Sequence, residues 1–172
     1  TITHESFLNS VPRKKALLVG VGVDTNLFNP FVSNSVVTKK YGLKGNTLIY
    51  VGSFKPWHMC EAMIKAVRIL RKSFKGIRLL MIGSGEKLEQ CKELVKAYNL
   101  ESEVIFVGPV ELAKIPEYIN ASDVCLALFD RNYPPFKKLD YFYSPIKLCE
   151  YKACGKPIIA SDFGNLRHLV SD

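Results

Sequence analysis

Hydrophobic residues gather into short runs along this chain, and each run is followed by a segment whose apolar residues recur every three or four positions. The first run is TLIYV at residues 47–51, and it is closed by Gly52. The helical spacing that follows is set by Met59, Met63, Ala66, Val67 and Leu70. We therefore predict a strand over 47–51 and a helix from Trp57 to about Phe74.

The same alternation continues to the end of the chain. Further strands are predicted at 77–82, 104–107, 124–129 and 157–160, and further helices at 86–98, 113–121, 146–154 and from 165 to 170. Residues 130–143 are aromatic, basic and proline-bearing, and we predict a loop there. Apolar strands that alternate with helices are typical of a parallel sheet covered on both faces. Right-handed crossovers then predict a doubly wound, mostly parallel, Rossmann-like α/β sheet.

The length of the chain bounds its organisation. A chain of 172 residues is sufficient for one α/β domain. We expect residues 1–16 to be a leading segment and residues 17–172 to form the Rossmann-like domain. This domain is expected to be incomplete at its C-terminal end, because another strand and helix would follow Asp172. No apolar run reaches the ~18 residues that a membrane-spanning helix needs.

The net charge and the cysteines of the chain limit its expected binding partners and its expected compartment. The formal net charge is +8, which fits an anionic ligand, an anionic membrane surface or simply a basic surface. Nucleic acid is disfavoured, because no helix-turn-helix, zinc-finger or RNA-binding signature is present. The five cysteines are an odd number without a C-x-x-C pair, and we interpret them as reduced, buried residues of a cytoplasmic protein.

The segment from Ser144 to Glu150 carries the clearest chemistry. Ser144 is suited to cap a helix, and Pro145 is suited to its first turn. The free amides of Ile146 and Lys147 would then form an anion site at the helix N-terminus, with the Lys147 ammonium beside it. Glu150 would accept hydrogen bonds from a vicinal diol such as ribose. The alternative is an ordinary capped helix with one surface lysine and one surface glutamate.

This segment also resembles a known motif. SPIKLCEYKACGKPIIASD, from Ser144 to Asp162, is similar to the donor-binding motif of retaining GT-B glycosyltransferases, the group 1 (family four) class. Three more stretches fit that family in order: GVDTNLFNP at 22–30, YVGSFKPWHM at 50–59, and LLMIGSGEKLEQCKELVKAYNLESEVIFVGPV at 79–110. The resemblance implies that the chain is one half of a GT-B fold, the C-terminal donor-binding half.

The resemblance implies roles in binding the nucleotide-diphospho-sugar. Glu150 would hold the ribose hydroxyls, and the amides of Ile146 and Lys147 would hold the diphosphate. Gly83 and Gly85 would let the nucleotide approach the backbone closely. The positions at which the backbone meets the base are Val110 and Leu112. No metal or other cofactor is implied, because such enzymes neutralise the diphosphate with helix dipoles and basic side chains.

Two departures from the family pattern concern the sugar and the cations. Phe142 stands where the first acid of the E-x7-E motif belongs, and this acid normally meets the sugar. In the glycine loop after the first strand, which includes Gly52, the usual arginine and lysine are replaced by Ser53 and His58. We expect Lys55 and His58, helped by Lys147, to replace the missing cations. A His58 that faces a diphosphate would be protonated; the alternative is a histidine at a helix start that binds no ligand.

The function implied by the resemblance is transfer of a sugar from a nucleotide-diphospho-sugar to an acceptor, with retention of the anomeric configuration. The acceptor would bind an N-terminal domain that this chain lacks. The expected location is the cytoplasm, with peripheral attachment to the inner face of the membrane also compatible with the basic charge. Two alternatives stay open: another GT-B enzyme, such as a nucleotide-sugar epimerase, and a Rossmann-like interaction module without catalysis.

Overall fold

A computed structural model describes residues 21–139, 145–164 and 166–170 of the chain. It contains a five-stranded sheet in the order β3-β2-β1-β4-β5, and every neighbouring pair is parallel. The strands are β1 Thr47–Val51, β2 Arg78–Ile82, β3 Val104–Gly108, β4 Val124–Ala127 and β5 Ile158–Ala160. This strand order confirms the prediction of a doubly wound, Rossmann-like sheet.

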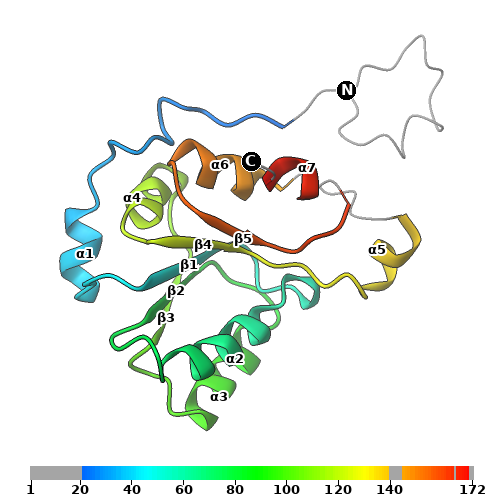
Figure 1. Cartoon of the computed structure of the whole chain (residues 1–172), viewed down its shortest axis with the longest axis horizontal. Coiled ribbons are helices and arrows are strands. Elements are labelled where there is room, and N and C mark those ends of the chain that lie inside the picture. The colour runs from blue at the N-terminus through cyan, green and yellow to red at the C-terminus, as the bar shows by residue number, and fades with distance from the viewer. Residues whose placement is uncertain (1–20, 140–144, 165, 171–172) are drawn as a thin grey trace.

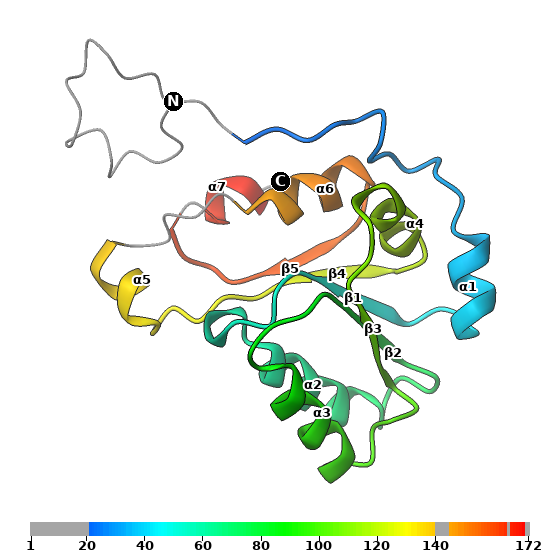
Figure 2. The same cartoon turned by 180° about the vertical axis from the view of Figure 1, so that it is seen from behind.

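Helices cover both faces of the sheet (Figures 1 and 2). The α-helices are α1 Ser35–Tyr41, α2 Cys60–Leu70, α3 Leu88–Ala97, α4 Ile115–Asn120, α5 Pro134–Leu139, α6 Ile146–Ala153 and α7 Leu166–Val170. Two 3-10 turns, η3 Pro56–His58 and η4 Leu112–Lys114, precede α2 and α4. Helices α2 and α3 pack on one face, and α1, α4, α6 and α7 pack on the other.

The core is divided by the sheet into two clusters. Ile49 and Tyr50, neighbours on β1, are both fully buried, and each belongs to a different cluster. Alternate residues of a strand point to opposite faces, so a strand buried on both faces must be apolar at every position. Each buried Ile or Leu contributes roughly 1.5–3 kcal/mol through the area that it removes from water. The unbroken apolar runs of the sequence follow from this burial.

The helix predicted from Trp57 is interrupted near its start. Met59 has a left-handed backbone with φ 47°, and it separates η3 from α2. Lys55, which caps η3, has the extended conformation that a residue before proline favours. This break turns the His58 ring back toward the loop that follows β1, where it bonds the Ser53 carbonyl.

Two further elements differ from the sequence interpretation. Helix α1 was not predicted, because only Val37 of its residues is buried and no repeated apolar pattern arises. The prediction of a loop over 130–143 is wrong for residues 134–139, which form α5. Proline suits the first turn of a helix, and Phe136 buries its ring in the core, so this short helix is stabilised by packing.

The remaining predictions concern cysteines, membrane spans and the chain ends. All five cysteines are free, as expected, but Cys149 is half-buried, so the prediction of burial is wrong for that residue. None of the helices in the described ranges is long and apolar enough to cross a membrane. The predicted leading segment, residues 1–16, lies outside the described residues, so the domain boundary at residue 17 stays a prediction.

Candidate functional site

The sheet order makes a topological switch point between the carboxyl ends of β1 and β4, and we call this place the crevice. The chain leaves β1 toward α2 on one face and leaves β4 toward α6 on the other face. Ligands of open α/β sheets bind at such a switch point. Three segments meet here: the loop after β1, which starts at Gly52, the residue Phe129 just past β4, and the first turn of α6.

The loops after β1 and β2 are joined by their backbones. The amide of Gly52 donates to the carbonyl of Ile82 at 2.9 Å, and the amide of Phe54 donates to the carbonyl of Ser84 at 2.9 Å. A Cβ on Gly83 would lie 2.1 Å from the Gly52 carbonyl oxygen, and one on Gly85 would lie 2.6 Å from the Phe54 nitrogen. Contact between the loops therefore requires both glycines, and the close approach of a nucleotide to them stays a prediction.

Lys147 places a buried ammonium group in the crevice. Its Nζ lies 4.5 Å from the centre of the Tyr50 ring and 5.4 Å from that of Phe129. Among the described residues, this shielded nitrogen has no hydrogen-bond partner. Burial lowers the pKa of Lys147 to about 8. The rings and the Glu150 charge offset part of the cost of burying the ammonium, but no acceptor among the described residues bonds it, so the site favours binding of a further anion.

Gly52 provides the room for this ammonium group. A Cβ at position 52 would lie 2.5 Å from Lys147 Nζ and 3.0 Å from the Tyr50 hydroxyl oxygen. The Tyr50 hydroxyl donates to the carbonyl of Ser53 at 2.6 Å, which holds the ring in place. The first glycine of the loop after β1 is therefore required by the lysine that lies against it.

The N-terminus of α6 supplies further donors beside Lys147. The helix begins at Ile146, and Pro145 occupies the N-cap position, so the prediction of Pro145 within the first turn is wrong by one residue. Ser144 and Phe142 lie outside the described residues. The amide of Leu148 donates to Pro145 at 2.9 Å, whereas the amides of Ile146 and Lys147 find no acceptor in the described part of the chain. Such amides and the helix dipole favour an anion.

Glu150 follows one turn later on the same helix. Its side chain is 8% exposed, and burial raises the pKa of the carboxyl group while the Lys147 charge opposes the rise. The sequence predicted Lys147 and Glu150 in one donor site with separate roles, and their electrostatic coupling shows that the structure brings them together. A carboxylate held in this way can accept hydrogen bonds from a diol that reaches the crevice.

His58 lies against the same rings but carries no charge in this structure. Its ring centre is 5.3 Å from that of Phe129, and its Nδ1 donates to the carbonyl of Ser53. Burial, and then the Lys147 charge, lower the pKa of His58 to about 4. Lys147, and not His58, is therefore the cation of the unliganded crevice. An anion that neutralises Lys147 would remove one cause of the lowered pKa of His58. That His58 is protonated in this liganded state stays a prediction.

The other predicted residues line the rim of the same edge. Lys55 Nζ lies 3.9 Å from the carboxylate of Glu86, and about half of each side chain is exposed, so this pair contributes little to stability. Val110 packs against the core after β3, and Leu112 on η4 is 61% exposed. β2 separates β3 from β1 in the sheet, so Val110 and Leu112 share the edge with the crevice without contacting Lys147.

The sequence interpretation missed three aromatic residues of the site. Tyr50 and Phe129 surround the Lys147 ammonium, and the Tyr151 hydroxyl accepts a hydrogen bond from the Val51 amide at 3.0 Å. Tyr151 thereby joins α6 to the end of β1. Aromatic residues at the carboxyl ends of apolar strands were the available signal. In the described ranges, no group of three or more His, Cys, Asp and Glu residues is placed to hold a metal ion.

A known family and several solved structures are similar to this chain. The family described as "Glycosyl transferases group 1" matches residues 37–172. Among solved structures, Anabaena HepE in complex with UDP and glucose is 17% identical with a TM-score of 0.78, and the match covers 99% of this chain and 46% of HepE. No curated protein matches the sequence.

Two more solved structures share the fold. The C-terminal domain of a glycosyl transferase group 1 family protein (LpcC) from Francisella tularensis is 21% identical with a TM-score of 0.65. That match covers 88% of this chain and 76% of the LpcC domain. Sucrose-phosphate synthase from Thermosynechococcus elongatus is 23% identical with a TM-score of 0.70, over 97% of this chain and 41% of the synthase. The chain thus spans less than half the length of HepE and of the synthase.

Proposed function

Because the chain belongs to the family of glycosyl transferases group 1, we propose that it is the donor-binding half of a retaining glycosyltransferase. The whole enzyme transfers a sugar, a hexose by family resemblance, from a nucleotide-diphospho-sugar to an acceptor. The acceptor binds an N-terminal domain, a division supported by the 46% of HepE that this chain covers. By itself the chain binds the donor nucleotide and does not catalyse transfer.

The observation that carries this proposal is the buried ammonium of Lys147 beside the N-terminus of α6, which has no hydrogen-bond partner among the described residues. A diphosphate at this point accepts hydrogen bonds from the amides of Ile146 and Lys147. Rotation about the long side chain of Lys147 brings its ammonium from between the two rings to the phosphate oxygens. These groups then stabilise the negative charge that grows on the leaving diphosphate as the bond to the sugar breaks.

The remaining site residues hold the nucleoside. Glu150 accepts hydrogen bonds from the ribose hydroxyls, and the backbone at Val110 and Leu112 meets the base at the β3 end of the edge. Gly83 and Gly85 let the loops after β1 and β2 pack closely, which leaves space above them for the nucleotide. Ser53, Lys55 and His58 border the sugar and phosphate side. HepE was solved with UDP, which makes uridine diphosphate the first nucleotide to test.

We also propose that the enzyme works in the cytoplasm at the inner face of a membrane. The five free cysteines fit a reducing compartment. The net charge of +8 fits a surface that faces anionic lipids.

Titration of the 172-residue chain with UDP, GDP and ADP tests the proposal. Trp57 is the chain's one tryptophan, and its ring lies 5.8 Å from that of His58, so its fluorescence reports on the crevice. We expect one nucleotide to bind at millimolar concentration or below. Glu150→Gln should weaken that binding about tenfold, because a hydrogen bond to a charged group contributes ~1.5 kcal/mol or more.

The matched control is Glu93→Gln, which removes an exposed acid on α3, remote from the crevice. It should leave the affinity unchanged. If none of the three nucleotides binds at millimolar concentration, the proposal of a donor site is wrong. If a nucleotide binds and Glu150→Gln leaves its affinity unchanged, the donor site stands but the assignment of Glu150 to the ribose is wrong.

A further inference from the structure

The segment that includes most of α2 and all of β2 is unusually basic. From Ala62 to Gly85 the chain has no Asp or Glu, and it has six basic residues: Lys65, Arg68, Arg71, Lys72, Lys75 and Arg78. Four of the six lie between the last turn of α2 and the turn that leads to β2, at residues 68–75. These charges play no part in the crevice, because the C-terminal end of α2 lies at the amino edge of the sheet.

Two large apolar side chains are exposed among these charges. Ile69 is 69% exposed, and Phe74 is 48% exposed. Lys72 and Lys75 flank Phe74, and both are exposed. We define the basic tip as Lys44, Arg68, Ile69, Lys72, Phe74 and Lys75.

The loop before β1 belongs to the same tip. The Asn46 side chain donates to the carbonyl of Lys75 at 3.4 Å, and the amide of Arg78 donates to the carbonyl of Asn46 at 3.0 Å. These bonds hold the exposed Lys44 close to the turn that contains Phe74. The tip is therefore assembled from two segments, and its cations do not depend on one flexible loop.

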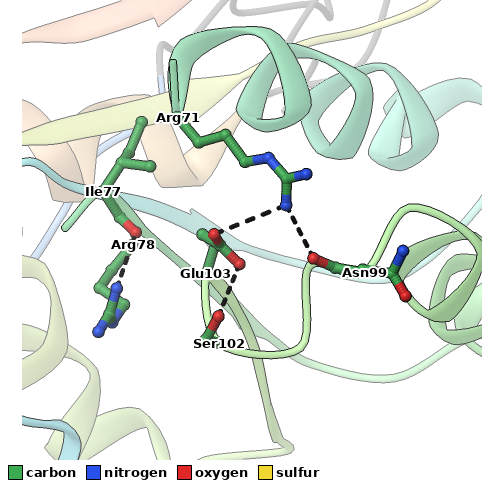
Figure 3. A network of polar contacts seen from close by, with 6 residues as sticks. All are labelled: Arg71, Ile77, Arg78, Asn99, Ser102 and Glu103. Carbon is green, nitrogen blue, oxygen red and sulfur yellow. Dashed lines mark hydrogen bonds and ion pairs between the residues drawn. The ribbon is translucent and has the colours of Figure 1, made fainter. Parts of the chain in front are cut away.

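Figure 3 shows how the base of the tip is fixed. The Arg71 guanidinium donates to the carbonyl of Asn99 at 2.8 Å and lies 3.7 Å from the carboxylate of Glu103. Ser102 donates to the same carboxylate at 2.9 Å. Arg71 is thus neutralised and structural. Lys72 and Lys75, in contrast, make no ion pair with any of the described residues.

A groove beside Phe74 extends the apolar surface. It has a volume of about 370 Å³, and its apolar walls are Leu48, Leu70, Phe74, Ile77 and Val124. Its one acid, Asp123, already accepts a hydrogen bond from the Thr47 amide at 2.7 Å. The exposed apolar surface therefore lies next to lysines that form no ion pair within the described part of the chain.

We propose that the basic tip docks the protein on an anionic lipid bilayer. Lysines at the headgroups supply the electrostatic attraction, and Phe74 and Ile69 enter the interface between headgroups and acyl chains. The apolar pair favours a bilayer over a nucleic acid, whose phosphates would attract the lysines alone. Docking through the amino edge leaves the crevice at the opposite edge free to bind the nucleotide.

Sedimentation of the 172-residue chain with vesicles tests the docking. We expect binding to vesicles that contain 30 mol% phosphatidylglycerol in phosphatidylcholine, and none to pure phosphatidylcholine. Lys72→Gln with Lys75→Gln should weaken binding about 30-fold, because each lysine near such a surface contributes about a fivefold change. Phe74→Ser should weaken it about fivefold, since only half of the ring is available for insertion.

The matched control is Lys114→Gln with Lys137→Gln, which removes the same charge from exposed positions on η4 and α5, elements that follow the carboxyl ends of β3 and β4. It should change binding by less than twofold. Equal weakening by both double variants, or an unaltered affinity in Phe74→Ser, would overturn the proposal. So would absence of vesicle binding, or preferential binding to duplex DNA or RNA. Thermal unfolding of each variant verifies that it is folded. Nucleotide titration is a separate measurement, so failure of vesicle binding does not decide whether the chain binds a nucleotide.

Discussion

Lys147 carries a charge that the surrounding protein solvates poorly. Its ammonium lies between the rings of Tyr50 and Phe129, and burial lowers its pKa to about 8 from an ordinary value of 10.5. In the unfolded chain the same group is fully hydrated. The folded state therefore bears a cost for keeping this cation, and in the proposed function a bound diphosphate would recover that cost.

We predict that Lys147→Met stabilises the unliganded protein while it weakens nucleotide binding. The lowered pKa corresponds to about 3 kcal/mol of unfavourable burial at neutral pH, where the lysine is charged in both states. Above pH 8 the folded state loses the proton first, so this gain should shrink as the pH rises from 8 and vanish near 10.5. Urea unfolding at pH 7 and at pH 10 measures the gain.

The same variant should bind UDP about 30-fold more weakly, because a charge-assisted contact with the phosphates is lost. Lys152→Met, at an exposed position of the same helix, is the control and should alter neither quantity strongly. A Lys147→Met protein that is less stable at pH 7 would show that the lysine supports the fold and is not held there for a ligand.

The sequence predicted several residues of the site, but it did not predict their pKa values or their protonation. The helix-start spacing of Ile146, Lys147 and Glu150 pointed to an anion and a diol from the sequence alone. The ring pair around the ammonium comes from positions 50 and 129, remote in the chain, so the lowered pKa of Lys147 depends on tertiary packing. The neutral state of His58 has the same origin, because it follows from burial and the neighbouring Lys147 charge.

At the scale of elements, the loops after β1 and β2 behave as one unit. Gly83 is pressed against the Gly52 carbonyl, and three backbone bonds join the two loops: Gly52 to Ile82, Phe54 to Ser84, and Lys87 to Phe54. The edge that would hold a nucleotide is therefore set by contact between backbones. A change at one loop must displace the other.

We predict that Gly83→Ala lowers the free energy of unfolding by about 3 kcal/mol, because the new Cβ must move the loops apart and the backbone at φ 126° is strained for alanine. The affinity for UDP should fall with it. Gly42→Ala, at the left-handed end of α1 with open space around it, should cost only ~1 kcal/mol and leave UDP affinity unchanged. Urea unfolding and the Trp57 titration measure both quantities. Equal effects of the two substitutions would contradict the contact between the loops.

Elements were predictable where burial repeats along the chain. Strands β1 and β2 are buried on both faces, so their apolar runs stand out, and α2 and α3 show a clear apolar stripe. Helix α1 buries one residue, and the left-handed Met59 interrupts a pattern whose periodicity continues across it. Patterns that arise from few contacts, or from a single backbone angle, leave no periodic trace in the sequence.

At the scale of the whole molecule, the order β3-β2-β1-β4-β5 gives the two edges of the sheet different surfaces. The carboxyl edge gathers glycine loops, the start of α6 and a buried cation. The amino edge carries the basic tip. The sequence predicted the parallel arrangement and hence the carboxyl edge as the ligand edge, because each glycine turn follows a strand. It did not predict the tip, since exposure of Ile69 and Phe74 is set by the tertiary fold.

The most direct test of the central claim is a map of backbone amide shifts on binding UDP and, separately, uridine. We predict that UDP shifts the amides of Gly52, Ile146 and Lys147, and that uridine at the same saturation leaves these three unmoved while shifting residues near Val110. This pattern would place the diphosphate at the α6 N-terminus. Shifts confined to other parts of the chain, or equal shifts of the three amides with both ligands, would contradict the assignment of Lys147 and α6 to the diphosphate.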